Sequence, residues 1–85
     1  MKTLHILRNI NDQFACTMIE AGMDASESAV LLMQDAVYDE LSFDSIKIFA
    51  CEEDTKARQI ESRYQKVSFD EIARMVVAYD RTIVW

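Results

Sequence analysis

An uninterrupted apolar run at residues 29–33 constrains the fold more than any other stretch of this sequence. The run is rich in Val and Leu, and it is bounded by Ser28 and by the polar residues Gln34 and Asp35. A short continuous run of this kind is typical of a strand covered on both faces, as in a parallel sheet. Apolar residues at helix-like spacing follow over residues 35–41. Because a buried strand leading into a helix is half of a βαβ unit, the sequence predicts an α/β fold.

The other segments repeat this alternation of strand and helix. Strands are predicted at residues 3–8, 46–50, 64–67 and 82–85, besides the one around the apolar run. Helices are predicted at residues 12–21, at 35–41, briefly around Ala57 and Ile60, and from a capping box at Ser68 and Glu71 to near Asp80. A polar loop at 23–27 and a turn at 42–44 connect them. The sequence therefore predicts one three-layer domain over residues 1–85, with a mostly parallel sheet of four or five strands flanked by helices.

Two of the predicted helices have apolar stripes that identify the side expected to face the sheet. In the first helix the stripe consists of Phe14, Ala15, Met18, Ile19 and Ala21, with Gly22 as the residue after the helix end. In the last helix it consists of Phe69, Ile72, Ala73, Val76 and Tyr79.

Charge and composition exclude several classes of protein. The formal net charge of −6 argues against a surface that binds nucleic acid, which needs clustered Lys and Arg. No apolar run approaches the roughly 20 residues of a membrane span, and none resembles a signal peptide. The two cysteines have no paired spacing, which indicates reduced thiols and a cytoplasmic location.

Motifs for cofactors and metals are missing from the sequence. Gly22 is the only glycine, and one glycine cannot build a phosphate-binding loop. One histidine and two distant cysteines do not make a zinc site, so we expect no cofactor. Asp35 after an apolar strand is superficially like a phospho-accepting receiver domain. That interpretation is rejected because Asn9 and Asn11 stand where an acidic pair is required.

Four blocks of the sequence together resemble the TusB/DsrH family. They are LHIL at 4–7, VLLMQDAVY at 30–38, KIFACEEDTKAR at 47–58 and SFDEIARMVVAYDRTIVW at 68–85. Members typically show LH near the start, an LLxxDGVY-like block, an ALxxDxxARG-like block and a terminal Trp. The match covers nearly the whole chain in order. Ala36 and Gln59 depart from it, since each replaces a glycine of the family pattern.

The resemblance implies a subunit of a sulfur-relay complex with a DsrEFH-like fold. TusB-like proteins assemble with TusC-like and TusD-like subunits into a heterohexamer that passes persulfide sulfur towards 2-thiolation of the wobble uridine in tRNA. The DsrH branch belongs to an analogous complex in sulfur oxidation. TusB-like chains often lack a sulfur-carrying cysteine, so a purely structural subunit is an open alternative. A small stand-alone ligand-binding protein is another.

Two cysteines are the candidate persulfide carriers, and the resemblance bears on both. Cys16 lies in the first helix, as a cysteine does in some DsrH-like chains. Cys51 follows the third strand, where TusD-like relatives place their reactive cysteine, with a matching arginine at Arg58. A helix start after Cys51 lowers a thiol pKa, whereas the acidic residues 52–54 raise it, so the sign stays open. Lys56 and Arg58 could offset those acids, and Cys51 is predicted to be the better acceptor.

Other polar and apolar side chains have structural interpretations. His5, within an apolar strand, is predicted to be a hydrogen-bonded core residue rather than a catalytic one. Asp35 is predicted to be a helix cap rather than an acid or base. The last strand, ending in Ile83, Val84 and Trp85, is expected to leave apolar surface or a strand edge. The chain is therefore expected to need partner subunits and to self-associate when alone.

Overall fold

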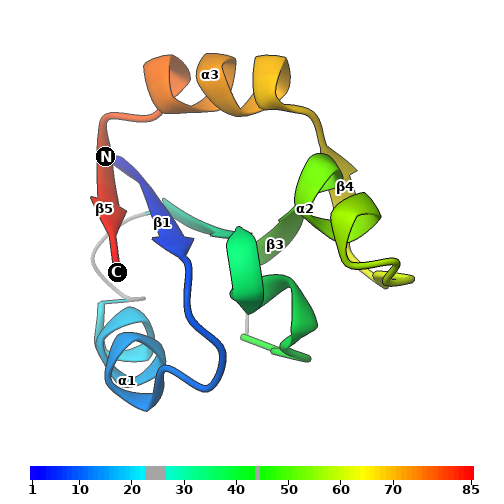
Figure 1. Ribbon diagram of the computed structural model, residues 1–85. Helices are drawn as coiled ribbons and strands as arrows, with labels where there is room; N and C mark the ends of the chain where they lie inside the picture. The colour runs from blue at the N-terminus through cyan, green and yellow to red at the C-terminus, as the bar shows by residue number, and fades with distance from the viewer. Residues whose placement is uncertain (23–26, 44) are drawn as a thin grey trace.

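The structure is a computed structural model that describes residues 1–22, 27–43 and 45–85. Its elements are β1 (Lys2–Leu7), α1 (Gln13–Ala21), β2 (Glu27–Leu32), the 3₁₀ helix η2 (Gln34–Tyr38), β3 (Lys47–Cys51), α2 (Glu52–Ala57), β4 (Gln65–Val67), α3 (Phe69–Ala78) and β5 (Arg81–Val84). The predicted alternation of strands and helices is confirmed (Figure 1). The loop predicted at 23–27 and the turn predicted at 42–44 lie partly outside the described residues.

The strands form one parallel sheet in the order β4-β3-β2-β1-β5. β2 lies in the middle, where Val30 pairs with His5 of β1 and with Ile48 of β3. The side chains of Val30, Leu31 and Leu32 have no exposed surface, so this strand is covered on both faces as the apolar run predicted. The predicted α/β fold with a parallel sheet is confirmed.

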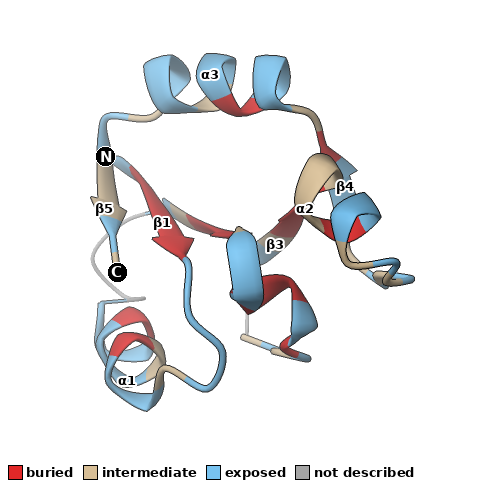
Figure 2. Ribbon diagram, in the orientation of Figure 1, coloured by how far each residue is buried: buried red, intermediate tan, exposed pale blue. Residues whose placement is uncertain are grey.

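Two hydrophobic clusters, one on each face of the sheet, produce the three layers. Ala15 and Ile19 of α1 pack with η2 on one face, while Ile72 of α3 packs on the other. The strands β2, β3 and β4 follow one another on one side of β1. α3 then crosses the opposite face of the sheet and leads to β5, which lies on the other side of β1. Right-handed crossovers require this change of face. Figure 2 shows that burial is concentrated in the inner strands, such as β1 and β3, and on the inner sides of the helices, whereas β5 is intermediate or exposed.

The capping box predicted at the start of α3 is confirmed. The Ser68 hydroxyl accepts a hydrogen bond from the Glu71 N–H at 3.2 Å, and the Glu71 carboxylate accepts one from the Ser68 N–H at 3.1 Å. These two bonds satisfy N–H groups that the first helical turn leaves without partners. They place the start of α3 directly after β4, close to the carboxyl end of β3.

The buried stripe predicted for α1 is partly wrong. Ala15 and Ile19 are buried, but Phe14 is 68% exposed, Met18 is 45% exposed and Ala21 is exposed. The apolar arc of the helix is wider than the strip that the sheet contacts. The helix is rotated so that one margin of the arc faces inward, and Phe14 contacts the Trp85 ring edge-on with ring centroids 6.0 Å apart.

The stripe predicted for α3 is partly wrong for the same reason. Ile72 is buried and Tyr79 is partly buried against the core, but Phe69, Ala73 and Val76 are exposed. The sheet contacts the side of the helix that carries Ile72, Tyr79 and the unpredicted Met75. A second apolar stripe is therefore left on the outside of α3.

Two local predictions also need correction. The segment after β2 is a five-residue 3₁₀ helix rather than an α-helix over 35–41, and its first residue, Gln34, has a φ of 51°. Met33 is its N-cap, so Asp35 is not a helix cap. Gly22 ends α1 with a φ of −89°, so it is not the left-handed residue that often follows a helix.

Candidate functional site

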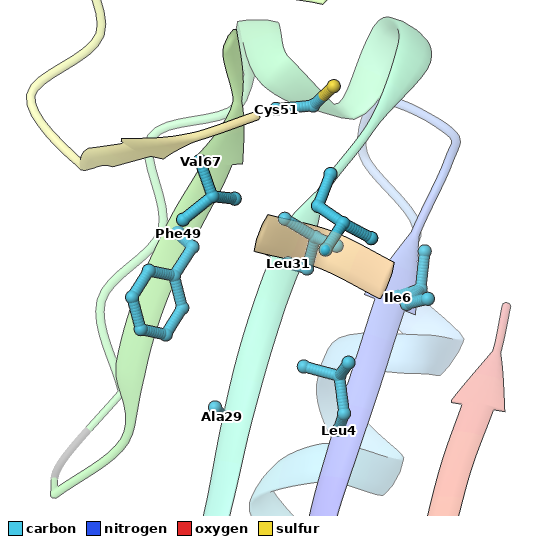
Figure 3. Packing of buried hydrophobic residues seen from close by; sticks show 8 residues of the cluster. Leu4, Ile6, Ala29, Leu31, Phe49, Cys51 and Val67 are labelled. Carbon is cyan, nitrogen blue, oxygen red and sulfur yellow. The ribbon is translucent and has the colours of Figure 1, made fainter. Parts of the chain in front are cut away.

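Cys51 lies at the carboxyl end of β3, where it is also the N-cap of α2. The location predicted from the sequence is therefore confirmed. Its side chain is fully buried and packs with Leu31, Val67 and Ile72 in the cluster between the sheet and α3. Figure 3 shows the thiol at the end of this cluster, above Val67 and Leu31. The cysteine thus belongs to the core, at the carboxyl ends of the strands where open α/β sheets bind ligands.

The surroundings of Cys51 raise the pKa of its thiol from 9.0 to about 11. Burial is the largest cause, because a thiolate loses its hydration in an apolar cluster. The Asp54 carboxylate raises the pKa further, whereas the backbone N–H groups of Glu53 and Asp54 lower it without reversing the shift. The direction of the pKa shift at Cys51, which the sequence left open, is thus upward. The Cys51 side chain is therefore protonated at pH 7.

Glu53 connects the Cys51 thiol to the start of α3. One carboxylate oxygen, Oε1, accepts a hydrogen bond from the Cys51 Sγ at 3.8 Å. The other, Oε2, accepts one from the backbone N–H of Phe69 at 3.2 Å. Sequence reasoning treated Glu53 only as part of an acidic run, because the chain distance of 16 residues to Phe69 hides this contact.

Arg58 joins the ends of β2 and β3. Its guanidinium group donates to Asp35 Oδ1 at 3.1 and 3.3 Å and to Asp54 Oδ1 at 3.4 Å. The other carboxylate oxygen of Asp54, Oδ2, accepts a hydrogen bond from the backbone N–H of Gln34 at 2.8 Å. This bond stabilises the left-handed backbone conformation of Gln34. Arg58 therefore pairs with two carboxylates, and that of Asp54 acts on the Cys51 thiol. The sequence analysis did not predict the ion pair with Asp35, because it joins residues 23 positions apart in the chain.

Lys56 and Cys16 are the other two candidate residues that the sequence singled out. Lys56 pairs with Glu52 at 3.3 Å on the surface of α2. Cys16 lies on α1, which covers the face of the sheet opposite to the Cys51 cluster, so the fold does not bring the two cysteines together. Burial and then the charges of Asp39, Asp12 and Glu20 raise the pKa of the Cys16 thiol.

His5 is a core residue, as predicted. It is buried in β1, where its Nδ1 accepts a hydrogen bond from the Trp85 indole N–H at 3.3 Å and the two rings stack with centroids 6.2 Å apart. Burial and then the nearby charge of Arg81 lower the pKa of the imidazole. His5 is therefore neutral at pH 7, and its role is to anchor the end of the chain at Trp85.

Neither a metal centre nor a membrane-spanning helix is found within residues 1–22, 27–43 and 45–85. Three or more His, Cys, Asp or Glu side chains in an arrangement that could hold a metal ion do not occur there. The helices in the same residues are too short and too polar to cross a bilayer.

Comparison with known proteins identifies the fold. The crystal structure of the ychN protein from E. coli is similar over 100% of both chains, with a TM-score of 0.71 and 13% sequence identity. The two proteins therefore share a fold. No family model matches the sequence, and no curated protein matches it. The predicted α/β architecture with a parallel sheet is confirmed at the level of the fold.

We expect the two cysteines of the folded chain to differ sharply in their reaction with a thiol reagent at about pH 8. Cys16 is half-buried and should be labelled, whereas Cys51 is fully buried and should stay unlabelled until the chain unfolds. Ellman's reagent applied to the Cys16→Ser and Cys51→Ser variants measures each thiol separately. Immediate labelling of the Cys16→Ser variant would show that the Cys51 thiol is accessible.

Proposed function

We propose that this chain is a subunit of a cytoplasmic sulfur-relay complex with TusC-like and TusD-like subunits. The complex passes persulfide sulfur towards 2-thiolation of the wobble uridine in tRNA. Two independent observations support the proposal. The four sequence blocks resemble the TusB/DsrH family over nearly the whole chain, and the fold is DsrEFH-like over the full length. With a net charge of −6, the isolated chain is not expected to contact tRNA directly.

Within this complex the chain acts through assembly, and the persulfide is carried by a partner subunit. The burial of Cys51 carries this part of the proposal, because a persulfide donor has to reach a thiolate. A thiol with a pKa of about 11 and no exposed surface is a poor acceptor at neutral pH. Cys16 lies on the opposite face of the sheet, and its pKa is also raised.

A carrier role for Cys51 is the second candidate, and one observation favours it. Cys51 occupies the carboxyl end of β3, and the Glu53 carboxylate accepts a hydrogen bond from its sulfur. Movement of Glu53 when a partner subunit binds would change the surroundings of the thiol. In that case sulfur is expected on Cys51 rather than on Cys16.

We expect the chain to copurify with two homologous small α/β subunits when it is expressed together with its neighbouring open reading frames. An affinity tag on one partner should retain this chain in a stable complex through gel filtration. A second acidic α/β protein of similar size, expressed with the same tagged partner, is the control for non-specific retention. If this chain elutes separately from both partners, it acts alone, and the stand-alone ligand-binding alternative replaces the proposal. A sulfur-oxidation role is distinguished by wobble-uridine thiolation that persists when the gene is deleted.

A further inference from the structure

A groove of about 300 Å³ lies between α3 and the β4 edge of the sheet. It is lined by Phe49 of β3, by Gln65 and Val67 of β4, and by Arg74, Met75 and Tyr79 of α3. β4 is the outermost strand on this side and has three residues, so the groove is open to solvent at the edge of the sheet. Sites for small molecules typically have volumes of roughly 300–1,000 Å³, and the groove is at the lower end of that range.

The floor of the groove is apolar and partly aromatic. Phe49 and Val67 point towards α3 from neighbouring strands and belong to the buried cluster on this face. Figure 3 shows the Phe49 ring beside Val67 at one margin of that cluster. Met75 and Tyr79 are partly buried against the same cluster from α3. A flat apolar group fits this lining, because an aromatic ring and a thioether both pack well against ring faces and edges.

Two cationic side chains border the apolar floor. Arg74 lines the groove from α3, and the Lys47 ammonium group lies over the Phe49 ring at 5.0 Å from its centroid. Asp70 and Glu71 lie one helical turn before Arg74, yet neither pairs with it. Within the described part of the chain, no ion pair is formed by Arg74 or Lys47. Both charges therefore remain available to an anionic group.

Glu71 contributes a carboxylate to the groove, but the start of α3 already uses this group. Its Oε1 accepts a hydrogen bond from the Ser68 N–H at 3.1 Å in the capping box. The groove thus combines two cations with one carboxylate that is held towards the helix start. This local excess of positive charge occurs on a chain with a net charge of −6, so it is a property of the groove rather than of the whole surface.

We propose that this groove binds a small amphipathic anion. Its flat apolar body lies against Phe49 and Met75, and its carboxylate or sulfonate group pairs with Arg74. The guanidinium group is planar and donates two parallel hydrogen bonds to an anion of this shape. A cationic ligand is disfavoured by the charges of Arg74 and Lys47. Because the groove is open, part of the ligand stays in water and the binding is weak.

Fluorescence titration of the folded chain with two matched dyes tests the ligand class. Anilinonaphthalene sulfonate (ANS) has the required apolar rings and an anionic group, and phenylnaphthylamine has the same rings without the sulfonate. Arg74→Ala is expected to weaken ANS binding about fivefold, because it removes an exposed ion pair with the sulfonate. The same variant should change phenylnaphthylamine binding by less than about twofold.

Lys66→Ala is the matched control for the loss of one positive charge. Lys66 lies between Gln65 and Val67 in β4, so its side chain points to the opposite face of the sheet. This variant should leave ANS binding unchanged, and Arg74→Lys should bind ANS more tightly than Arg74→Ala does. Arg74 and Lys66 are exposed, and circular dichroism verifies that the variants fold. Equal losses for Arg74→Ala and Lys66→Ala, or a wild-type chain that does not bind ANS, would overturn the proposal.

Methyl NMR spectra of the chain with ANS test the location. The Met75 methyl group should shift in the ring current of the bound dye, because it lines the groove. The Val77 methyl groups are 86% exposed, and two residues after Met75 they lie on the other side of α3. They should not shift. Shifts at Val77 without a shift at Met75 would place the dye on the outer side of the helix and refute the groove as the site.

This inference goes beyond the proposed function and does not depend on it, because the titrations use the isolated chain. A titration of the complex with the homologous subunits distinguishes the two. ANS binding that persists in the complex and still depends on Arg74 supports a ligand site. Displacement of ANS by assembly would show that a partner subunit covers the groove, which rejects the ligand site and leaves the sulfur-relay proposal intact.

Discussion

Replacing Leu31 by alanine is expected to lower the free energy of unfolding by about 3 kcal/mol. Leu31 lies in the central strand β2, has no exposed surface and packs with Ile6 and Phe49 under α3 (Figure 3). Truncation removes apolar contacts and leaves a cavity that a sheet covered on both faces cannot close. A domain of 85 residues has a total stability of about 5–10 kcal/mol, so the loss brings the chain close to unfolding.

Urea denaturation followed by circular dichroism measures this effect. Val77→Ala is the matched control, since it removes apolar atoms from a side chain that is 86% exposed, and it should change the stability by about 0.5 kcal/mol or less. Similar losses for Leu31→Ala and Val77→Ala would contradict the described core. The comparison also verifies that the outer side of α3 makes no contribution to folding of the isolated chain.

The strands were predictable because their physical requirement is visible in the local sequence. A continuous apolar run such as residues 29–33 has to be covered on both faces, and that condition favours a parallel sheet with helices on either side. The start of α3 was predictable for a similar reason, since Ser68 and Glu71 satisfy each other's backbone N–H groups three residues apart.

The rotation of the helices was not predictable from periodicity. Apolar residues cover about half of the circumference of α3, and the sequence does not show which part of that arc contacts the sheet. The structure assigns Ile72 to the core and Val76 to the surface, although the two residues are one turn apart. The positions of the strands before and after a helix decide which of its sides faces the sheet. Those positions depend on the whole fold and not on the sequence of the helix alone.

The contacts at the candidate site were only partly predictable. The place of Cys51 at a strand end follows from the local pattern, but the pKa of its thiol depends on burial, which adjacent residues do not determine. The hydrogen bond from Phe69 to Glu53 and the ion pair of Arg58 with Asp35 join segments 16 and 23 residues apart. Such contacts become visible only when the strand order is known.

The second large effect is expected in the reconstituted sulfur-relay complex. Because Cys51 is fully buried and its thiol is protonated at neutral pH, sulfur offered to the complex should accumulate on a partner subunit. Cys51→Ala should leave sulfur transfer unchanged, and Cys16→Ser should do the same. Alanine is used at Cys51 because a small apolar side chain fits the cluster, and copurification with the partners verifies that the variant still assembles.

Intact-mass spectrometry of this complex after reaction with a persulfide donor tests the central claim most directly. The proposed assembly role predicts added sulfur on a partner subunit and an unchanged mass for this chain, in the wild type and in both cysteine variants. One added sulfur atom on the wild-type chain that is absent from the Cys51→Ala variant would contradict that role and identify Cys51 as a carrier.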